Sequence, residues 1–241
     1  MKRSKKAVVR MVVAVLLVLG VMLEGGRVYY AWNQRTEGKR GYTVVIDPGH
    51  GGIDPGKVGV NDVYEKDINL SISMLLKEIL EQNDCKVIMT RDTDEGLYQG
   101  GESNKKMADL RKRCQMIDES GADVTVSIHQ NSFSQQSSRG AQVFYQTSSA
   151  NGKLLAEILQ KQLISSLDEN NRRVAKANSN YYMLKHTKNT MVIVECGFLS
   201  NPEEAQQLTD STYQRRVAWA VALGTLQYLE SGKEAESLPA D

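Results

Sequence analysis

Short apolar runs alternate with longer amphipathic segments over most of the chain. Six short runs predict β-strands, at residues 43–46, 85–90, 123–128, 141–145, 182–184 and 191–194. Four longer segments with apolar residues at helical spacing predict helices, at residues 66–80, 105–119, 152–167 and 213–229. This alternation predicts an α/β fold: a single domain with a twisted, mostly parallel but mixed sheet of about six strands and helices on both faces.

The N-terminal 41 residues have a different pattern. Five basic residues lie within the first ten positions, and an apolar run follows from Met11 to Leu23. As a helix this run would span only about 20 Å, less than the ~30 Å hydrocarbon core. Residues 1–23 therefore predict an export signal or membrane anchor that places the rest of the chain outside the cytoplasmic membrane, and the poor cleavage pattern after the run favours the anchor. Residues 24–41, with four glycines and no apolar period, predict a linker.

The rest of the chain has the composition of an ordinary folded domain, which we expect at residues 42–231 with a polar tail at 232–241. Hydrophobic residues make up 41% and charged residues 24% of the chain. Beyond the first ten residues, 25 basic residues stand against 29 acidic ones, which argues against a nucleic-acid-binding protein. Cys85, Cys114 and Cys196 lack the spacing of a metal site and predict small buried residues rather than a disulfide framework.

Four residues with metal or proton chemistry are predicted to meet at one edge of the sheet. His50 follows the first strand in a glycine-rich loop, and His129 and Glu195 follow two other strands. Glu65 opens the first helix. Because functional loops lie beyond the carboxyl ends of strands in open α/β sheets, these side chains should converge. Two imidazoles and a carboxylate suit a catalytic Zn²⁺ with one open position, and a second carboxylate suits a proton shuttle.

Each of these residues also has a simpler interpretation. The glycine-rich loop after residue 46 resembles a phosphate cradle, but it lacks the spacing and the lysine of such loops. Glu65 alone would be interpreted as an acid that stabilises the first turn of a helix. Glu195, however, stands between two apolar runs, where a carboxylate is costly without a cation or hydrogen bonds. Together the four residues favour a functional site.

The four residues lie in blocks that identify a resemblance. Residues 47–52 (DPGHGG), 65–70 (EKDINL), 127–132 (SIHQNS) and 195–201 (ECGFLSN) occur in the order of the signature blocks of a known family. Over residues 43–229 the chain resembles the zinc-dependent N-acetylmuramoyl-L-alanine amidases of amidase family 3, and most resembles their spore-cortex members. Any one block is modest evidence, whereas four in order are specific.

The resemblance implies a reaction and a set of residue roles. It implies that His50, Glu65 and His129 ligate Zn²⁺ and that Glu195 is the catalytic acid/base. The substrate would be peptidoglycan, cleaved at the amide between the lactyl group of N-acetylmuramic acid and L-alanine. Lesser matches at Arg91, Arg113 and Asn131 imply residues that support the site or contact substrate.

The chain departs from the family pattern at two places. Where the family often has Ala-Asn after the residue matched by Arg113, the chain has Ile117-Asp118, and it also lacks a frequent proline before Glu195. His186, between two lysines, has no counterpart in the signature blocks and is not expected to be a ligand.

The resemblance leaves alternatives open for the biological role. The compact layout favours spore-cortex maturation, with muramic-δ-lactam formation, over a general cell-separation amidase. A zinc peptidase acting on the stem peptide, or a wall-binding module without activity, are further alternatives. Targeting is expected from the anchor, the domain itself or an activating partner protein. Only residues 146–152 separate the fourth predicted strand from the next helix, too few for a helix that plugs the site.

Overall fold

The computed structural model describes residues 41–237, with side chains described as far as Ser231. The chain divides into two compact units, Met1–Gly41 and Tyr42–Asp241. The predicted anchor at residues 1–23 and nearly all of the predicted linker at 24–41 lie outside the described residues. Within the described part of the chain, no helix is both long enough and apolar enough to cross a membrane.

A six-stranded mixed sheet forms the centre of the second unit. Its strands are β1 (Thr43–Pro48), β2 (Lys86–Met89), β3 (Val124–Asn131), β4 (Gln142–Tyr145), β5 (Lys176–Ala177) and β6 (Met191–Phe198). Their order across the sheet is β2-β1-β3-β6-β4-β5. All neighbouring pairs are parallel except β4 and β6, which run antiparallel. The predicted fold class, a mostly parallel but mixed sheet of about six strands, is confirmed.

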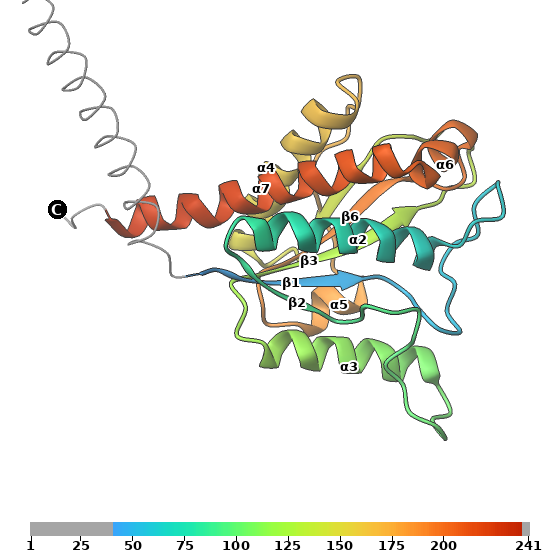
Figure 1. Ribbon diagram of the computed structural model, residues 1–241, viewed down its shortest axis with the longest axis horizontal. Helices are drawn as coiled ribbons and strands as arrows, with labels where there is room; N and C mark the ends of the chain where they lie inside the picture. Colours follow the sequence, from blue (N-terminus) through green and yellow to red (C-terminus); the bar gives the residue numbers. More distant parts are fainter. Residues whose placement is uncertain (1–40, 238–241) are drawn as a thin grey trace, which may run out of the picture. The chain divides into compact units, whose positions relative to one another are not determined.

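Helices cover both faces of this sheet (Figure 1). On one face lie α2 (Glu65–Gln82), α4 (Ala150–Leu167), α6 (Pro202–Thr209) and α7 (Ser211–Ser237). On the other lie α3 (Lys105–Glu119) and α5 (Tyr182–His186).

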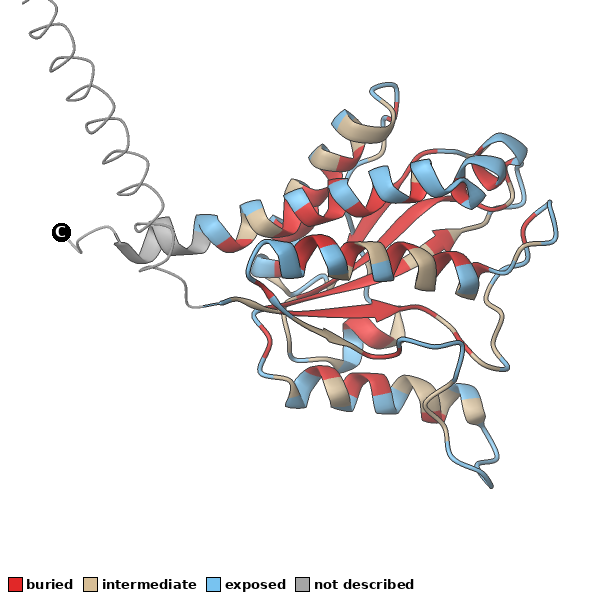
Figure 2. Ribbon diagram, viewed as in Figure 1, coloured by how far each residue is buried: buried red, intermediate tan, exposed pale blue. Residues whose placement is uncertain are grey.

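Alternation along the central strands fills two cores. Val44 and Ile46 of β1 pack with the apolar face of α2, whereas Val45 packs with Ile117 of α3. Figure 2 shows the same division as buried strands between helices whose outer faces are exposed.

The predicted strand at residues 182–184 is wrong, because these residues form α5. Main-chain N–H groups of Lys185 and Thr187 donate to carbonyls four residues earlier, as in a helix. An apolar run of three residues has too little periodicity to separate helix from strand. The edge position of the sheet is taken instead by the two-residue strand β5, which the apolar pattern does not reveal.

Two further differences concern helices. The short helix α6 was not predicted, although Asn201 caps its N-terminus by accepting from the main-chain N–H groups of Glu203 and Glu204, with Pro202 in its first turn. The last helix, expected at residues 213–229, continues to Ser237.

The three central strands bring the candidate residues to one edge of the sheet. β1 leads into the loop that carries His50, and β3 and β6 run side by side with His129 opposite Glu195. Both strands continue past these residues instead of ending at them, and a bulge interrupts their register between His129 and Asn131. The spacing between the second imidazole and the candidate base is therefore set by main-chain pairing of neighbouring strands.

Candidate active site

Three of the predicted residues converge on one point. Nε2 of His50 lies 3.2 Å from one carboxylate oxygen of Glu65, and Nδ1 of His129 lies 3.0 Å from the other. One ligand atom from each residue lies within 4.8 Å of the other two. The two imidazole rings meet edge to face with their centroids 5.0 Å apart. This group has the donor atoms and the size needed to hold a metal ion.

His50 is oriented by its own loop. Its backbone has a φ of 63°, in the left-handed region that non-glycine residues rarely adopt. The carboxylate of Asp54 lies 3.0 Å from Nδ1, which directs Nε2 towards Glu65. Burial lowers the pKa of His50, but Asp54 and Glu65 more than offset this and raise it to about 9. In the absence of a metal, the extra proton on the His50 imidazole offsets the negative charge of Glu65. A metal ion bound at this point would offset that charge instead, and it would bind His50 in its neutral form.

Glu65 is the first residue of α2, and its carboxylate is fully engaged. The main-chain N–H groups of Lys57 and Gln130 donate to its two oxygens at 2.8 and 3.0 Å. Burial raises the pKa of Glu65, but the imidazoles of His129 and His50 outweigh burial and hold that pKa well below its usual range. The carboxylate is therefore ionised, as a metal ligand must be.

Gly49 makes room for the second imidazole. A Cβ atom built at Gly49 would come within 2.2 Å of the His129 ring, so any side chain there would collide with that ring. The backbone of the loop and the imidazole consequently pack in direct contact. Glycine is required here for space, not for an unusual φ.

Two buried arginines hold the loop that carries His50. Arg91 donates to the carbonyls of Pro48 and Gly49 at 2.9 and 3.0 Å. Arg113 donates to the carbonyls of Pro48 and His50 and forms an ion pair with Asp47 at 2.8 Å. Both guanidinium groups bond to the protein's own carbonyls and carboxylates and so support the loop, and Arg113 also lines the pocket next to the imidazoles.

Asp47 is the centre of this buried network. Besides Arg113, it accepts hydrogen bonds from Thr90 and Ser127, each at 2.6 Å. Burial alone raises the pKa of Asp47, but the Arg113 guanidinium and these hydroxyl groups together lower it to about 2. The charge of Asp47 therefore persists in the core.

Glu195 lies on β6 in a less satisfied environment. The side chain is only 7% exposed, and its Oε2 atom has no hydrogen-bond partner among the described residues. The hydroxyl of Tyr181 donates to the other oxygen at 3.3 Å. Burial is the main cause of a raised pKa at Glu195, and the neighbouring imidazoles only partly offset it. A buried carboxylate with a vacant oxygen and a raised pKa is suited to taking and returning a proton.

The remaining predicted residues lie at or beyond the border of the site. Asn131 ends β3, where its main-chain carbonyl accepts from Leu199 and its side-chain oxygen accepts from the N–H of Ser132. These contacts shape the bulged end of β3. His186 is exposed, stacks on Tyr182 and does not belong to the metal-holding group.

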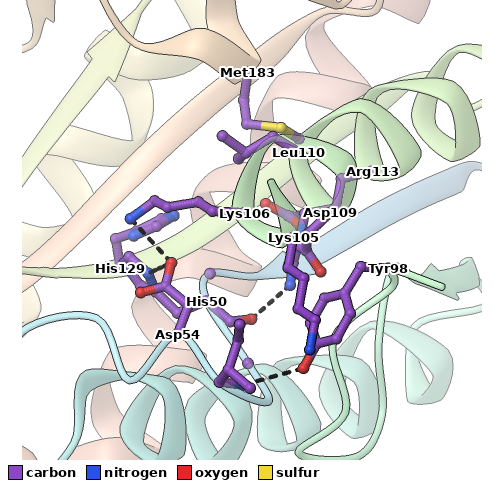
Figure 3. A pocket seen from close by; sticks show the side chains of 14 residues that line it. His50, Asp54, Tyr98, Lys105, Lys106, Asp109, Leu110, Arg113, His129 and Met183 are labelled. Carbon is purple, nitrogen blue, oxygen red and sulfur yellow. Dashed lines mark hydrogen bonds and ion pairs between the residues drawn. The ribbon is translucent and has the colours of Figure 1, made fainter. Parts of the chain in front are cut away.

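A pocket adjoins the two imidazoles on the side of α3 (Figure 3). His50 and His129 form part of its wall, and Tyr98, Lys105 and Lys106 form another part. Figure 3 shows these side chains around one hollow, with the Asp54 carboxylate between the imidazole of His50 and the ammonium of Lys106.

Sequence reasoning assigned no role to several residues of the site. Asp54 lies four positions after His50, and that short spacing was a usable signal. Tyr181 and Tyr98 gave no such signal because both lie outside the regular elements, and Lys105 gave none because its place at the start of a predicted helix does not show which pocket it lines. Asp47 lies in the first signature block, but its structural role becomes visible only in its buried ion pair with Arg113.

Comparison with known proteins agrees with this geometry. The Amidase_3 family model, described as N-acetylmuramoyl-L-alanine amidase, matches residues 44–227. The chain belongs to this family. As a member it is an N-acetylmuramoyl-L-alanine amidase that acts on peptidoglycan, which confirms the enzyme class that the resemblance implied.

Individual relatives match over most of this amidase. The germination-specific N-acetylmuramoyl-L-alanine amidase of Bacillus subtilis (strain 168) is 36% identical over 209 residues, 85% of this chain and 86% of that protein. The amidase LytC of the same strain is 32% identical over 78% of this chain and 36% of its own length. The CwlD amidase from Clostridioides difficile, solved in complex with the GerS lipoprotein, superimposes with a TM-score of 0.77 at 39% identity, covering 79% of this chain and 99% of that one.

Proposed function

We propose that this amidase uses Zn²⁺ held by His50, Glu65 and His129 to hydrolyse the amide between the lactyl group of N-acetylmuramic acid and L-alanine. We further propose that its substrate is spore-cortex peptidoglycan, whose freed muramic acid residues proceed to muramic-δ-lactam. The observation that carries the proposal is the three-residue group that could hold a metal ion, together with the buried carboxylate of Glu195. Glu195 lies opposite one of these residues, His129, on the neighbouring strand, and one of its oxygens has no partner among the described residues.

The donor set favours zinc over other abundant cations. Two imidazole nitrogens and one carboxylate oxygen form a catalytic set of three ligands, which leaves a position for water or substrate. Mg²⁺ and Ca²⁺ prefer shells of oxygen atoms. The Nδ1 atom of His50 already bonds to Asp54, the second partner that a zinc-bound imidazole commonly has.

The residues of the chain divide the reaction between them. Bound Zn²⁺ would supply Lewis-acid polarisation of the scissile carbonyl and a water of lowered pKa. Oε2 of Glu195, which has no hydrogen-bond partner in the described part of the chain, takes the proton of the attacking water and then gives it to the departing alanine nitrogen. Tyr181 holds the second oxygen of Glu195 and so fixes the direction of the transfer.

The finer biological role rests on relatives. The B. subtilis relative is named a germination-specific amidase, which supports a role in the spore. The complex of the C. difficile relative with a lipoprotein supports a protein partner for this chain as well. Peptidoglycan lies outside the cytoplasmic membrane. The basic and apolar pattern of residues 1–23 supports export to that location, as an anchored or a secreted protein.

Product analysis tests the reaction. The purified domain should release peptides with N-terminal L-alanine from peptidoglycan, and mass spectrometry should show intact stem peptides. Cleavage within the stem would favour the alternative of a zinc peptidase, and no cleavage would favour a module without activity. Elemental analysis should find one zinc per chain, and His129→Ala should lose both the zinc and the activity.

The cortex assignment needs a separate measurement. Spores of a strain that lacks this amidase should contain cortex without muramic-δ-lactam, and expression of the wild-type chain should restore it. The Glu195→Gln chain should not. Normal lactam content in the deletion strain, together with a defect in cell separation, would instead identify a general cell-separation amidase.

A further inference from the structure

The pocket beside the imidazoles contains a positive charge without a partner. Lys105, the first residue of α3, lines this pocket and is half-buried. Within the described residues its ammonium group has no carboxylate partner, and its one recorded contact is with the ring of Tyr98, 5.3 Å from the ring centroid. A half-buried ammonium group without a counter-ion is a ready site for an anion.

The acidic residues of the pocket do not supply that counter-ion. Asp47 and Asp109 are both engaged by the guanidinium of Arg113. The carboxylate of Asp54 is held between His50 and Lys106, each 3.0 Å away. Of the charged side chains that line this pocket in residues 41–237, Lys105 is therefore the one left without a counter-ion.

A lysine at the position of Lys105 is also unfavourable for the helix dipole of α3. Helix α3 has two lysines and no acidic residue in its first turn, where the helix dipole favours negative charge. Such a conflict between local preference and structure is expected where function requires it. An anion bound at Lys105 would remove the conflict.

We propose that Lys105, supported by the ring of Tyr98, binds the free α-carboxylate of the D-glutamyl residue that follows L-alanine in the stem peptide. This inference rests on the proposed function, because it needs the scissile amide to lie at the metal centre. D-glutamate is linked onward through its γ-carboxyl group, so its α-carboxylate remains free. The glycan strand is neutral at muramic acid residues joined to a peptide and offers no such anion.

The span of one peptide residue is compatible with this direction of the stem peptide. One residue of extended chain spans at most about 3.6 Å, so a carboxylate one residue beyond the cleaved bond remains close to the metal ligands. The pocket begins at the metal ligands themselves, because His50 and His129 are part of its wall. The stem peptide then lies towards α3, and the glycan lies along another part of the site.

A pair of matched substrates tests the subsite. Soluble glycan strands with uncrosslinked stems would be prepared with the D-glutamyl α-carboxyl group either free or as a carboxamide. The wild-type enzyme should prefer the free acid about tenfold in kcat/KM, the lower end of the range for a charge-assisted hydrogen bond, because Lys105 is only half-buried. Added salt should weaken the preference.

Three variants sharpen this test. Lys105→Met should reduce the preference for the acid to about one, and Lys105→Arg should retain most of it. Lys112→Met, which removes an exposed lysine of the same helix that does not line the pocket, should behave as wild type. In the Glu195→Gln background, calorimetry should show weaker binding of the acid, but not of the amide, when Lys105 is replaced by Met.

The outcomes separate the subsite from the proposed function. If the wild-type enzyme cleaves acid and amide equally, or if Lys105→Met slows both by the same factor, the carboxylate subsite is wrong while the amidase reaction stands. If the wild-type enzyme releases no stem peptide from either substrate, the proposed function fails and the subsite fails with it.

Discussion

Two buried carboxylates at the same edge of the sheet, Asp47 on β1 and Glu195 on β6, lie in opposite electrostatic environments. At the end of β1, Asp47 has an ion pair with Arg113 and two hydroxyl donors, and its pKa is lowered to about 2. On β6, Glu195 has one weak donor, one oxygen without a partner among the described residues, and a raised pKa. Both carboxylates are less than a tenth exposed.

The groups that contact the two carboxylates, and not the extent of their burial, explain why their pKa values shift in opposite directions. Burial raises the pKa of both Asp47 and Glu195, but only Asp47 has a guanidinium group in contact with it. The first carboxylate is thereby fixed as a permanent charge that holds the loop of His50. The second has a raised pKa and so keeps a greater affinity for protons than an ordinary glutamate, and two carboxyl groups so separated take different roles.

The largest expected effect comes from the β6 end. Glu195→Gln keeps the shape of the side chain and removes the base, so we expect turnover on peptidoglycan to fall at least ~10²-fold while zinc and fold remain. Metal analysis and thermal unfolding alongside the activity assay check this. A Glu195→Gln enzyme that works at the wild-type rate would show that the proton is carried by another group.

Removing the charge of Asp47, at the end of β1, should reduce the stability of the folded protein. Asp47→Asn leaves the buried guanidinium of Arg113 without its main counter-charge, and we expect the free energy of unfolding to fall by about 3–5 kcal/mol. Asp94→Asn is the control, because Asp94 is half-exposed in its ion pair with Lys66 and should cost at most about 1 kcal/mol. Urea denaturation measures both. Equal losses in the two variants would contradict the structural role of Asp47.

The same contrast predicts how stability depends on pH. The folded-state pKa of Asp47 is lowered from 3.8 to about 2, so its contribution is complete above the unfolded value and is lost as pH falls through that interval. The contribution should amount to about 2 kcal/mol. Urea denaturation at about pH 5 and about pH 2 should therefore show a smaller gap between wild type and Asp47→Asn at the lower pH. A constant gap would contradict the low pKa.

The smallest expected effect concerns the single donor to Glu195. Tyr181 stabilises the ionised form of Glu195, so Tyr181→Phe should raise the pKa of Glu195 and move the acidic limb of the kcat profile to higher pH. We expect a shift below about one pH unit and a loss below about tenfold at neutral pH, the range for one hydrogen bond. An unchanged profile would mean that Tyr181 does not contact the working base.

The convergence of the candidate site residues could be predicted from sequence because each lies in a short block within or next to a regular element. His50 follows β1, Glu65 opens α2, and His129 and Glu195 lie in the second halves of β3 and β6. The apolar patterns of these elements are clear, and a parallel sheet brings such positions together. The roles of Arg91 and Arg113 could not be settled in this way, since a guanidinium that supports a loop and one that contacts substrate have the same sequence pattern.

The missed features depend on irregular segments. Tyr181 contacts Glu195 from the extended position just before α5, next to an apolar run that suggested a strand. Lys105 and Tyr98 meet because of the path that the chain takes between β2 and α3, which no periodicity describes. The short strand β5 has only two residues, both exposed, and pairs through its main chain. Features that depend on main-chain pairing or on the path of a loop cannot be predicted from the pattern of apolar and polar side chains.

The contact between Gly49 and the imidazole of His129 matters for how related sequences are interpreted. Every missense change at codon 49 introduces a side chain where that ring lies, and neither Gly49 nor His129 belongs to the two cores. Lineages that no longer need this enzyme could thus retain a well-folded, abundant and silent protein whose ligands are all present. Genome surveys that score activity by the ligands alone would count such proteins as enzymes, and inspecting position 49 would correct the count.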